Sequence, residues 1–282
     1  MVLLTALLAC SGPDGGDTAT AAAPRACNGS AALCDRQLDE VVLAVAHNAM
    51  NVEDEGWDYP NQHHGYEQQV ADGIRGFMLD VYLEGDVTTL CHADCSLGSE
   101  PLPEALDRFT ALLDQHPSDV FVFVIQDETE AAPIVAAFEA AGLVDRLIVP
   151  PAAGEPWPTL GALVDAGTQL LVTHEKAQPG APAWYPAAYD LAWDNDYSSQ
   201  SVDDFDCAAL RGDRANPIFL VNHFLTVGLA SDALAAEANP EAVIRDHVDR
   251  CEAETGDRVN WIAVDFYDVG DVVAVVDALN AR

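Results

Sequence analysis

The chain has 282 residues, a length that suits one barrel-sized domain with a large buried core. Half of the residues are hydrophobic and 21% are charged, as in ordinary folded proteins, but 47 acidic residues against 12 basic ones leave a formal net charge of −35. Because this charge repels nucleic-acid phosphates, the composition argues against a DNA- or RNA-binding role, and it also opposes unaided docking on anionic membranes.

Residues 1–10 predict an export signal. Residues 1–9 are hydrophobic, and the run Leu7-Leu8-Ala9-Cys10 has the form of a bacterial lipobox, which implies cleavage before Cys10 and attachment of lipid to its thiol. An ordinary secretory signal with an incidental cysteine is the alternative. We therefore expect an exported protein: either a bacterial cell-envelope lipoprotein, at the outer membrane or cell surface and held there by its N-terminal lipid anchor, or a secreted protein.

Residues 11–26 are predicted to form a flexible tether, because they combine Gly, Pro, Ala, Thr and Asp without a hydrophobic period. From Cys27 onward there is no second linker, low-complexity run or internal repeat. Residues 27–282 are therefore expected to form a single domain, and we expect that domain to be a monomer.

Hydrophobic runs alternate with amphipathic segments along this domain. Strands are predicted at residues 41–46, 76–82, 120–125, 169–173, 218–221 and 261–264. Helices are predicted at residues 66–71, 102–115, 130–141, 160–166, 242–254 and 271–281. Several strands are hydrophobic on both faces, which is typical of parallel sheets covered by helices, so the pattern favours an α/β barrel or a doubly wound sheet. No glycine-rich nucleotide-binding motif follows a strand, which argues against a nucleotide-binding protein.

Six cysteines remain after Cys10, namely Cys27, Cys34, Cys91, Cys95, Cys207 and Cys251. An even number in an exported chain indicates three disulfides, although the sequence permits fifteen pairings. The short loops favour local pairing of Cys27 with Cys34 and of Cys91 with Cys95, which leaves the last two for each other. A zinc site is the alternative, but the spacings C-x6-C and C-x3-C fit zinc poorly.

Polar side chains stand at the ends of the predicted strands. In a parallel barrel the active site lies at the carboxyl ends of the strands, so we expect these side chains to gather on one rim. The candidates are His47 and Asn48 after the first strand, Arg75 and Asp80 at the start and near the end of the second, His92 after the next extended segment, Asp127 after the third strand and Asp265 after the last.

Two histidines that face one phosphodiester can perform acid–base catalysis. A neutral imidazole removes a proton from the attacking hydroxyl, and a protonated imidazole gives a proton to the leaving oxygen; a pKa near 6.5 allows both roles around neutral pH. An arginine such as Arg75 would stabilise negative charge on the phosphate, and Asp265 would orient one imidazole.

Four residues are candidates for substrate binding, namely Asn48, Asp80, Tyr82 and Trp193. The aromatic rings offer hydrophobic faces against which a sugar or inositol ring can pack. Core packing is the alternative for aromatic residues such as Trp193.

Four segments carry a resemblance to a known family: CNGSAALCDRQLDEVVLAVAHNAM, QQVADGIRGFMLDVY, LCHADCSLGSEPL and HPSDVFVFVIQDE. In this order they resemble the X-domain of phosphatidylinositol-specific phospholipase C, most closely its secreted branch from plants, fungi and bacteria. The later segments AAGLVDRLIVPP, EPWPTLGALV and NWIAVDFYDVGDVVAVVDALN are similar to the same branch. The resemblance covers about nine-tenths of the chain beyond the tether.

The resemblance implies a single-domain, distorted TIM-type (β/α)8 barrel and a reaction in which an inositol 2-hydroxyl attacks phosphorus. His47 falls on the family's general base and His92 on its general acid. Asn48 and Asp80 fall on metal-binding positions of the calcium-dependent members.

Two departures weaken the implied metal site. Met78 and Gln126 stand where calcium-dependent members have glutamates, and calcium prefers several carboxylates among six to eight oxygen ligands. We therefore expect no firmly bound cofactor, and at most a weakly held calcium or magnesium ion on Asn48, Asp80 and Asp127. In the metal-independent bacterial members an arginine takes the position of Asp80, so the chain matches neither pattern.

The sequence thus predicts a phosphoric diester hydrolase or lyase that acts on a phospholipid or a soluble phosphodiester. One alternative is a non-catalytic, lipid-anchored barrel that binds a sugar phosphate or a lipid headgroup. Another is a related barrel phosphodiesterase that uses a divalent metal on glycerophosphodiesters or sphingolipids.

Overall fold

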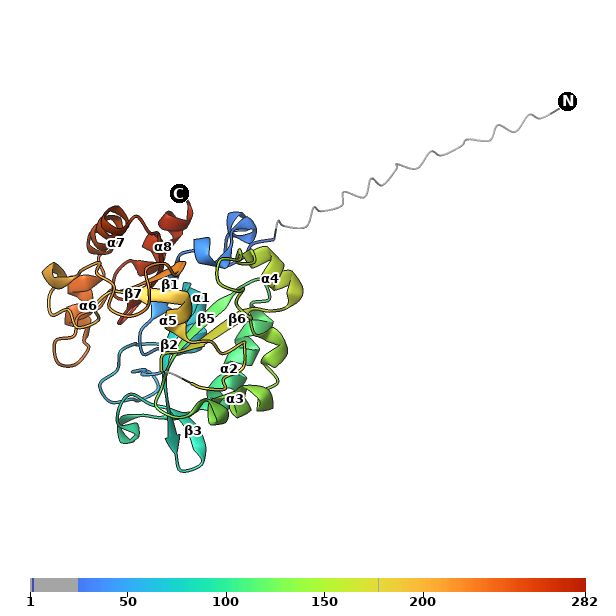
Figure 1. The fold of residues 1–282 in the computed structure, drawn as a ribbon, viewed down its shortest axis with the longest axis horizontal. Helices are drawn as coiled ribbons and strands as arrows, with labels where there is room; N and C mark the ends of the chain where they lie inside the picture. Colours follow the sequence, from blue (N-terminus) through green and yellow to red (C-terminus); the bar gives the residue numbers. More distant parts are fainter. Residues whose placement is uncertain (1, 3–24, 177) are drawn as a thin grey trace.

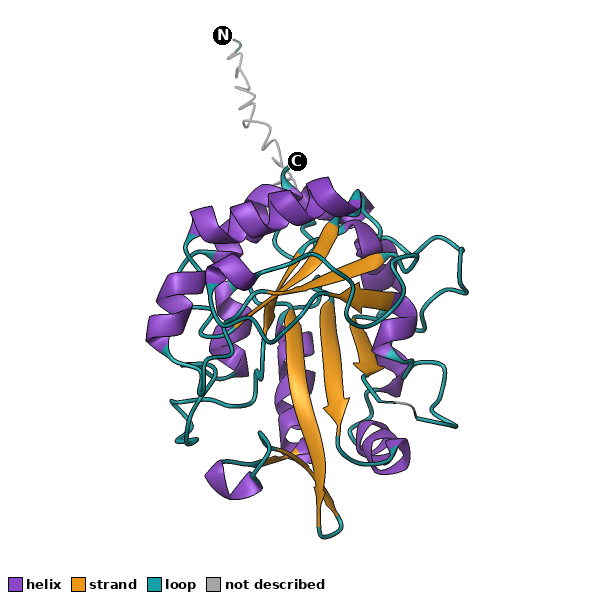
Figure 2. Ribbon diagram, turned by 60° about the vertical axis from the view of Figure 1, so that its left-hand side comes forward, coloured by secondary structure: helices purple, strands orange, loops and turns teal. Residues whose placement is uncertain are grey.

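The computed structural model describes Val2, residues 25–176 and residues 178–282 of the chain. This part forms one curled sheet with helices around it (Figure 1, Figure 2). The strands are β1 (Leu43–Ala46), β2 (Gly76–Glu84), β3 (Val87–Leu90), β4 (Glu100–Pro101), β5 (Phe121–Asp127), β6 (Leu170–His174), β7 (Ala192–Asp194), β8 (Ile218–Asn222) and β9 (Val259–Val264). The α-helices are α1 (Tyr66–Asp72), α2 (Leu102–Gln115), α3 (Ala131–Ala140), α4 (Leu160–Ala166), α5 (Ala188–Leu191), α6 (Asp232–Ala238), α7 (Glu241–Thr255) and α8 (Val272–Asn280).

The parallel strands lie in the order β6, β5, β2, β1, β9, β8 and β7. Strands β3 and β4 extend the sheet antiparallel to the far end of β2. In the described part of the chain no ladder joins β6 to β7, and the isolated bridge of His174 leads to Ala187, ahead of α5. The fold is therefore the expected α/β barrel type in an incompletely closed form, with seven parallel strands instead of eight.

Hydrophobic side chains on both faces of the strands produce this architecture. Along β5, Phe121 and Phe123 belong to the core that packs against the outer helices, whereas Val122 and Val124 belong to the core inside the curl. Because successive side chains of a strand point to opposite faces, one hydrophobic run supplies both cores. Helix α2 covers the outer face with buried residues that recur every three or four positions.

The six predicted strands and six predicted helices are all present, with ends that differ by at most two residues. The extended segment expected ahead of His92 is β3, although its antiparallel pairing was not predicted, and the sequence patterns did not reveal β4, β7, α5 and α6. Strand β7 has three residues and α5 has four, which is too short for a period to be visible. Helix α6 has seven residues, is rich in alanine and is capped by Ser231.

Three disulfides join Cys27 to Cys34, Cys91 to Cys95 and Cys207 to Cys251, which confirms the expected local pairing. The first holds the start of the domain, where Asn28 bonds the backbone of Ser118 and Val120 just ahead of β5. Arg25 binds Asp165 and the Gly161 carbonyl of α4. The chain thus enters the fold at the amino ends of the strands.

The predicted signal at residues 1–10 and most of the predicted tether at residues 11–26 lie outside the described residues. Within the described residues, no helix combines the length and hydrophobicity that a membrane span requires.

Candidate active site

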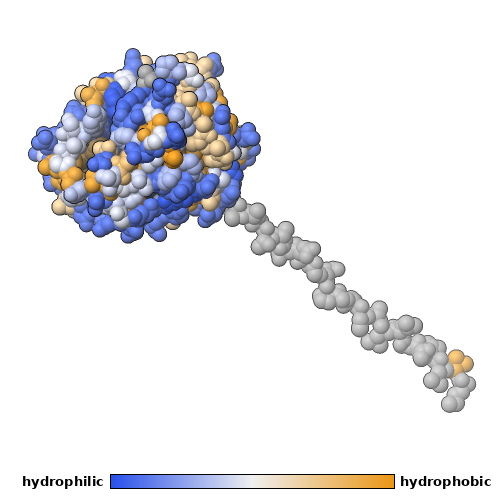
Figure 3. All heavy atoms as spheres, turned by 90° about the horizontal axis from the view of Figure 1, so that it is seen from below, coloured by the Kyte–Doolittle hydropathy of each residue, from blue (hydrophilic) through white to orange (hydrophobic). Residues whose placement is uncertain are grey.

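A cavity of about 630 Å³ opens at the carboxyl ends of the parallel strands. Its walls include His47, Asn48, Met78, Asp80, Tyr82, His92, Gln126, Glu128, Glu175, Lys176, Tyr197, Arg211 and Asp265. In Figure 2 strand arrowheads point down, toward the side of the molecule that Figure 3 shows from below. That side is largely hydrophilic, with separate hydrophobic patches. The cavity is of the size that ligand-binding sites commonly have.

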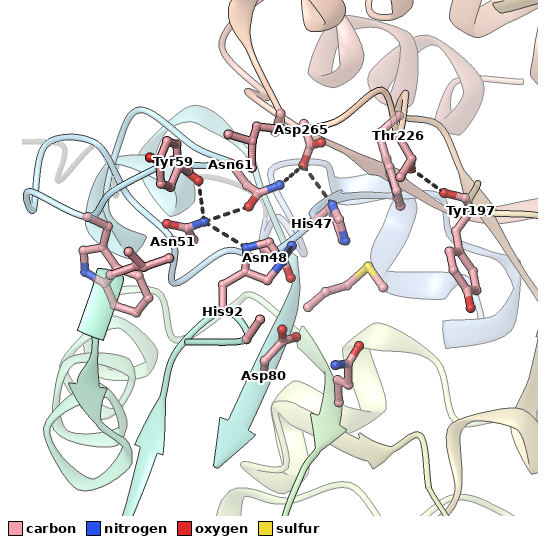
Figure 4. Close-up of a pocket in the computed structure, with 18 of the residues that line it drawn as sticks. His47, Asn48, Asn51, Tyr59, Asn61, Asp80, His92, Tyr197, Thr226 and Asp265 are labelled. Carbon is pink, nitrogen blue, oxygen red and sulfur yellow. Dashed lines mark hydrogen bonds and ion pairs between the residues drawn. The ribbon is translucent and has the colours of Figure 1, made fainter. Parts of the chain in front are cut away.

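His47 lies at this rim because β1 ends at the residue before it. Its backbone N–H donates to the Val264 carbonyl, and Asp265 follows β9, the parallel neighbour of β1. The His47 Nδ1 and Asp265 Oδ1 atoms are 2.8 Å apart, and Asn61 Nδ2 donates to the same Oδ1 at 2.9 Å (Figure 4). Since a carboxylate only accepts, Nδ1 carries the proton and Nε2 is left with a lone pair that can act as a base.

His92 lies in the loop that the Cys91–Cys95 disulfide closes. Its Nδ1 is 3.2 Å from Asn51 Nδ2, which also donates to Asn61 Oδ1 at 2.8 Å, so side-chain amides connect His92 to the Asp265–His47 pair (Figure 4). Its Nε2 is 3.4 Å from Asn48 Nδ2. Burial lowers the pKa of His92, and the nearby His47 lowers it further.

Asp80 lies in the middle of β2, opposite Gln126 of β5. It is almost wholly buried, and this burial raises the pKa of its carboxyl to about 7. The carboxylates of Glu175 and Glu128 raise it as well, against the charges of His47 and Lys176. This carboxyl therefore holds a proton at a higher pH than an ordinary aspartate does.

The residues of the cavity do not fit the calcium site that the resemblance implies. Met78 and Gln126 line the cavity with a thioether and an amide where carboxylates would be needed. Asp127 faces elsewhere: its Oδ1 accepts from the backbone N–H groups of Glu175 and Lys176 at 3.1 and 2.9 Å. The prediction that Asp127 joins Asn48 and Asp80 in a metal site is therefore wrong.

Two other predicted residues lie away from the cavity. Arg75 stands at the amino end of β2, where its Nη2 is 2.7 Å from Asp119 Oδ2 and its Nη1 donates to the Val70 and Ile74 carbonyls. Trp193 is fully buried and stacks on Phe219 with ring centroids 3.6 Å apart. Both are structural residues, so the predictions of a phosphate-stabilising Arg75 and a substrate-stacking Trp193 are wrong.

The arginine that does line the cavity is Arg211, which sequence patterns missed. Its Nε donates to Asp194 Oδ2 at 2.9 Å and its Nη1 to Glu175 Oε2 at 3.1 Å. The guanidinium also lies over the rings of Tyr189 and Tyr197, 4.5 and 4.8 Å from their centroids. Arg211 lies outside the strands, in a segment without a period, so no sequence signal pointed to it.

The amides that support the two histidines were missed as well. Asn51 and Asn61 belong to the irregular segment between β1 and α1, and Asn61 is buried. Gln62, in the same segment, donates to the carbonyls of His47 and Val264 at 2.7 and 3.0 Å. This segment thus fixes both the backbone of His47 and the carboxylate behind its ring.

Comparison with known proteins places this geometry in a family. The family model PI-PLC X 1 matches residues 33–280. A PI-PLC X domain-containing protein of Arabidopsis thaliana is 26% identical over 78% of the chain, and an uncharacterized secreted protein of Arthroderma benhamiae is 25% identical over 92%. The chain spans 55% and 64% of the lengths of these two relatives.

Solved structures show the same fold. The phosphatidylinositol-specific phospholipase C of Listeria monocytogenes superposes with a TM-score of 0.61 at 15% identity, and that of Staphylococcus aureus with 0.59 at 14%. Each match covers 88% of this chain and 94% of the other. With a family match over nearly the whole described domain, the chain belongs to the PI-PLC X domain family.

Proposed function

We propose that this protein is a phosphoric diester hydrolase or lyase of the phospholipase C type. The observation that carries the proposal is that His47 and His92, which are 45 residues apart in sequence, line one cavity, with Asp265 bound to the first. Its family and fold support a phosphodiesterase, and two imidazoles at one cavity supply the base and the acid that such a reaction needs.

In the proposed reaction the Nε2 atom of His47 removes the proton from an attacking hydroxyl of the substrate. The oxygen then forms a bond to phosphorus, and the imidazolium that results is stabilised by the carboxylate of Asp265. His92 gives a proton to the leaving oxygen as its bond to phosphorus breaks. A cyclic phosphate is the product when the attacking hydroxyl belongs to the substrate itself.

Two cations line the cavity, Arg211 and Lys176. We assign to them the binding of the negatively charged phosphate or of polar groups beside it. Both already have carboxylate partners, Arg211 in Asp194 and Glu175, and Lys176 in Glu128. A substrate with a single phosphodiester charge and many hydroxyl groups would match such a site, because hydroxyls can donate to the remaining carboxylate oxygens.

A panel of substrates followed by ³¹P NMR tests the proposal. Vesicles of phosphatidylinositol in neutral lipid, a soluble inositol phosphodiester and a glycerophosphodiester are each incubated with the protein. Cleavage of at least one, with a cyclic phosphate or phosphomonoester signal, is the expected result. Tight binding of inositol phosphate without turnover of any substrate would favour the non-catalytic headgroup-binding alternative.

We expect this activity to be insensitive to metal removal. The cavity offers a thioether at Met78 and an amide at Gln126 where a calcium ion would need carboxylates. The rate should change by less than about twofold when EDTA replaces calcium in the assay. The paired variant Met78→Glu and Gln126→Glu is the matched control, since it should bind calcium measurably in a titration. Loss of wild-type activity in EDTA would instead support a metal-dependent phosphodiesterase.

The acid role of His92 predicts an acid-shifted pH profile. Burial lowers the pKa of His92, and a general acid works only while it is protonated, so activity should fall as pH rises through a value below the 6.5 of a free imidazole. The measurement is kcat/KM of the best substrate across the acid and neutral range. Asp80→Asn is the control, because the descending limb should persist without that carboxyl. A limb above 6.5 in both proteins would contradict the assignment.

We also propose that the protein is exported. Three disulfides and a relative described as secreted support export. The bacterial lipid anchor on Cys10, the monomeric state and the absence of a nucleic-acid partner belong to the same proposal. Mass spectrometry of the membrane fraction would detect the lipid-modified peptide.

A further inference from the structure

Phe224 covers one face of the His47 imidazole. The two rings are stacked with centroids 3.9 Å apart and an angle of 4° between their planes, and Phe224 is buried. Asp265 holds Nδ1 in the ring plane, whereas Phe224 fixes the orientation of that plane. Neither contact alone determines where Nε2 points, because a single hydrogen bond still allows the ring to tilt.

Phe224 is held in turn by the residue before it. His223 is fully buried, and its backbone N–H donates to the Ala263 carbonyl of β9 at 2.8 Å. Its Nε2 is 2.8 Å from the Ala238 carbonyl at the end of α6, and its Nδ1 is 2.9 Å from Nδ1 of His247 on α7. The segment after β8 is therefore tied to a strand and two helices.

His247 completes this arrangement on the far side. Its Nε2 is 3.0 Å from the Asp206 carbonyl, and the ring of Phe205 stacks on it with centroids 4.7 Å apart. The charged groups that act on the pair are the side chains of Asp246 and Arg250 on α7. The carboxylate of Asp206 follows Phe205 in the segment packed against the pair.

These two imidazoles are unsuited to proton transfer at neutral pH. Burial lowers the pKa of His223 to about 3 and that of His247 to about 4. Both rings are therefore neutral, and neither lines the cavity. Two neutral imidazoles carry two N–H protons between them, so only two of the three close contacts, with the Ala238 carbonyl, with the Asp206 carbonyl and between the two Nδ1 atoms, are hydrogen bonds at one time. Their contacts with backbone carbonyls and with each other are structural. Through Phe224, which stacks on His47, they also support the proposed general base.

We propose that Phe224, held by the buried pair His223 and His247, is a positioning residue that orients the general base His47. This inference deepens the proposed function and rests on it for its kinetic consequence. The contacts themselves do not depend on any activity.

The variant Phe224→Leu tests the inference in two independent ways. Loss of the stacked ring should remove its upfield ring-current shift from the His47 ring protons in NMR spectra of the substrate-free protein. It should also lower kcat by about tenfold with KM changed by less than about twofold, because misorientation of the base affects the chemical step more than binding. Phe224→Tyr keeps the aromatic face and should restore both readouts.

The matched control is Phe219→Leu, the same change on β8 where the ring stacks on Trp193 instead. It should lower stability while leaving the His47 resonances and kcat as in the wild type. Equal effects of Phe219→Leu and Phe224→Leu would overturn the inference, because they would show that general loosening of the fold is responsible.

The pair behind Phe224 is tested through His247. His247→Leu removes both of its polar contacts and should shift the His47 resonances partway toward those of Phe224→Leu, whereas His247→Gln retains an amide that can donate and should shift them less. Unchanged His47 resonances in a folded His247→Leu protein would overturn the role of the pair. If the wild-type protein cleaves no phosphodiester but the variants show these changes in the His47 resonances, the proposed function is refuted and the positioning contacts stand.

Discussion

Replacing His92 with alanine should lower kcat by about 10²- to 10⁴-fold, the usual contribution of one general acid or base, without unfolding the protein. The leaving oxygen would lose its proton donor, and no other side chain bonded to His92 carries a proton of suitable acidity, since Asn48 and Asn51 are amides. His47→Ala should have an effect of the same size, because it removes the group that activates the attacking hydroxyl.

The control is His116→Ala. His116 lies at the amino end of the barrel, 3.5 Å from Asp119, and is remote from the cavity. It should retain wild-type kcat. Circular dichroism and a thermal melt establish that each variant is folded before its rate is measured. Full activity in either cavity variant would remove that histidine from the mechanism.

Replacing Asp265 with asparagine should lower kcat by about 10²-fold or more, with the cavity intact. The wild-type carboxylate accepts from both His47 Nδ1 and Asn61 Nδ2 on a single oxygen. Asparagine has one oxygen that accepts and an NH₂ group that donates, so only one of its two amide orientations keeps these hydrogen bonds. It also supplies no negative charge to the imidazolium that forms when His47 takes a proton. The loss should therefore appear mainly in kcat.

Asp257→Asn serves as the comparison for this substitution. Asp257 pairs with Arg214 at the surface, so its change removes the same charge without touching the cavity. A surface pair of this kind contributes at most about 1 kcal/mol. Equal rates for Asp265→Asn and the wild type would show that the carboxylate has no part in orienting or stabilising His47.

Most of the positions that were predicted correctly lie on or directly after a strand whose hydrophobic run is visible in the sequence. His47 after β1 and Asp265 after β9 meet because parallel neighbours end at the same rim, so their contact follows from topology. Asp80 and Tyr82 reach the cavity along β2 for the same reason.

The prediction for Arg75 is wrong because Arg75 and Asp80 lie at different heights along the same strand. Residues 75 and 80 are separated along one strand by about 16 Å at the rise of an extended chain, so they occupy opposite ends of the barrel. At the amino end, the guanidinium of Arg75 pairs with the carboxylate of Asp119. The presence of an arginine in a strand motif thus does not show whether its side chain lies at the amino or the carboxyl end of the barrel.

The remaining site residues could not be predicted, because they lie in irregular segments. Arg211 reaches the cavity only because the backbone around it pairs with Asp194, and Asn51 and Asn61 depend on the path of the segment that precedes α1. Such paths are fixed by tertiary contacts between residues far apart in sequence. The local spacing of hydrophobic residues therefore does not predict the path of an irregular segment.

The attachment of Arg25 beside α4, at the pole opposite the cavity, has a practical consequence. A sensor chip or bead coupled through the amino-terminal end would hold the molecule with its opening toward the flowing solution. Ligands and vesicles could then reach the opening without steric interference from the support. Coupling through random carboxylates would give no such common orientation, because acidic side chains are spread over the whole sequence.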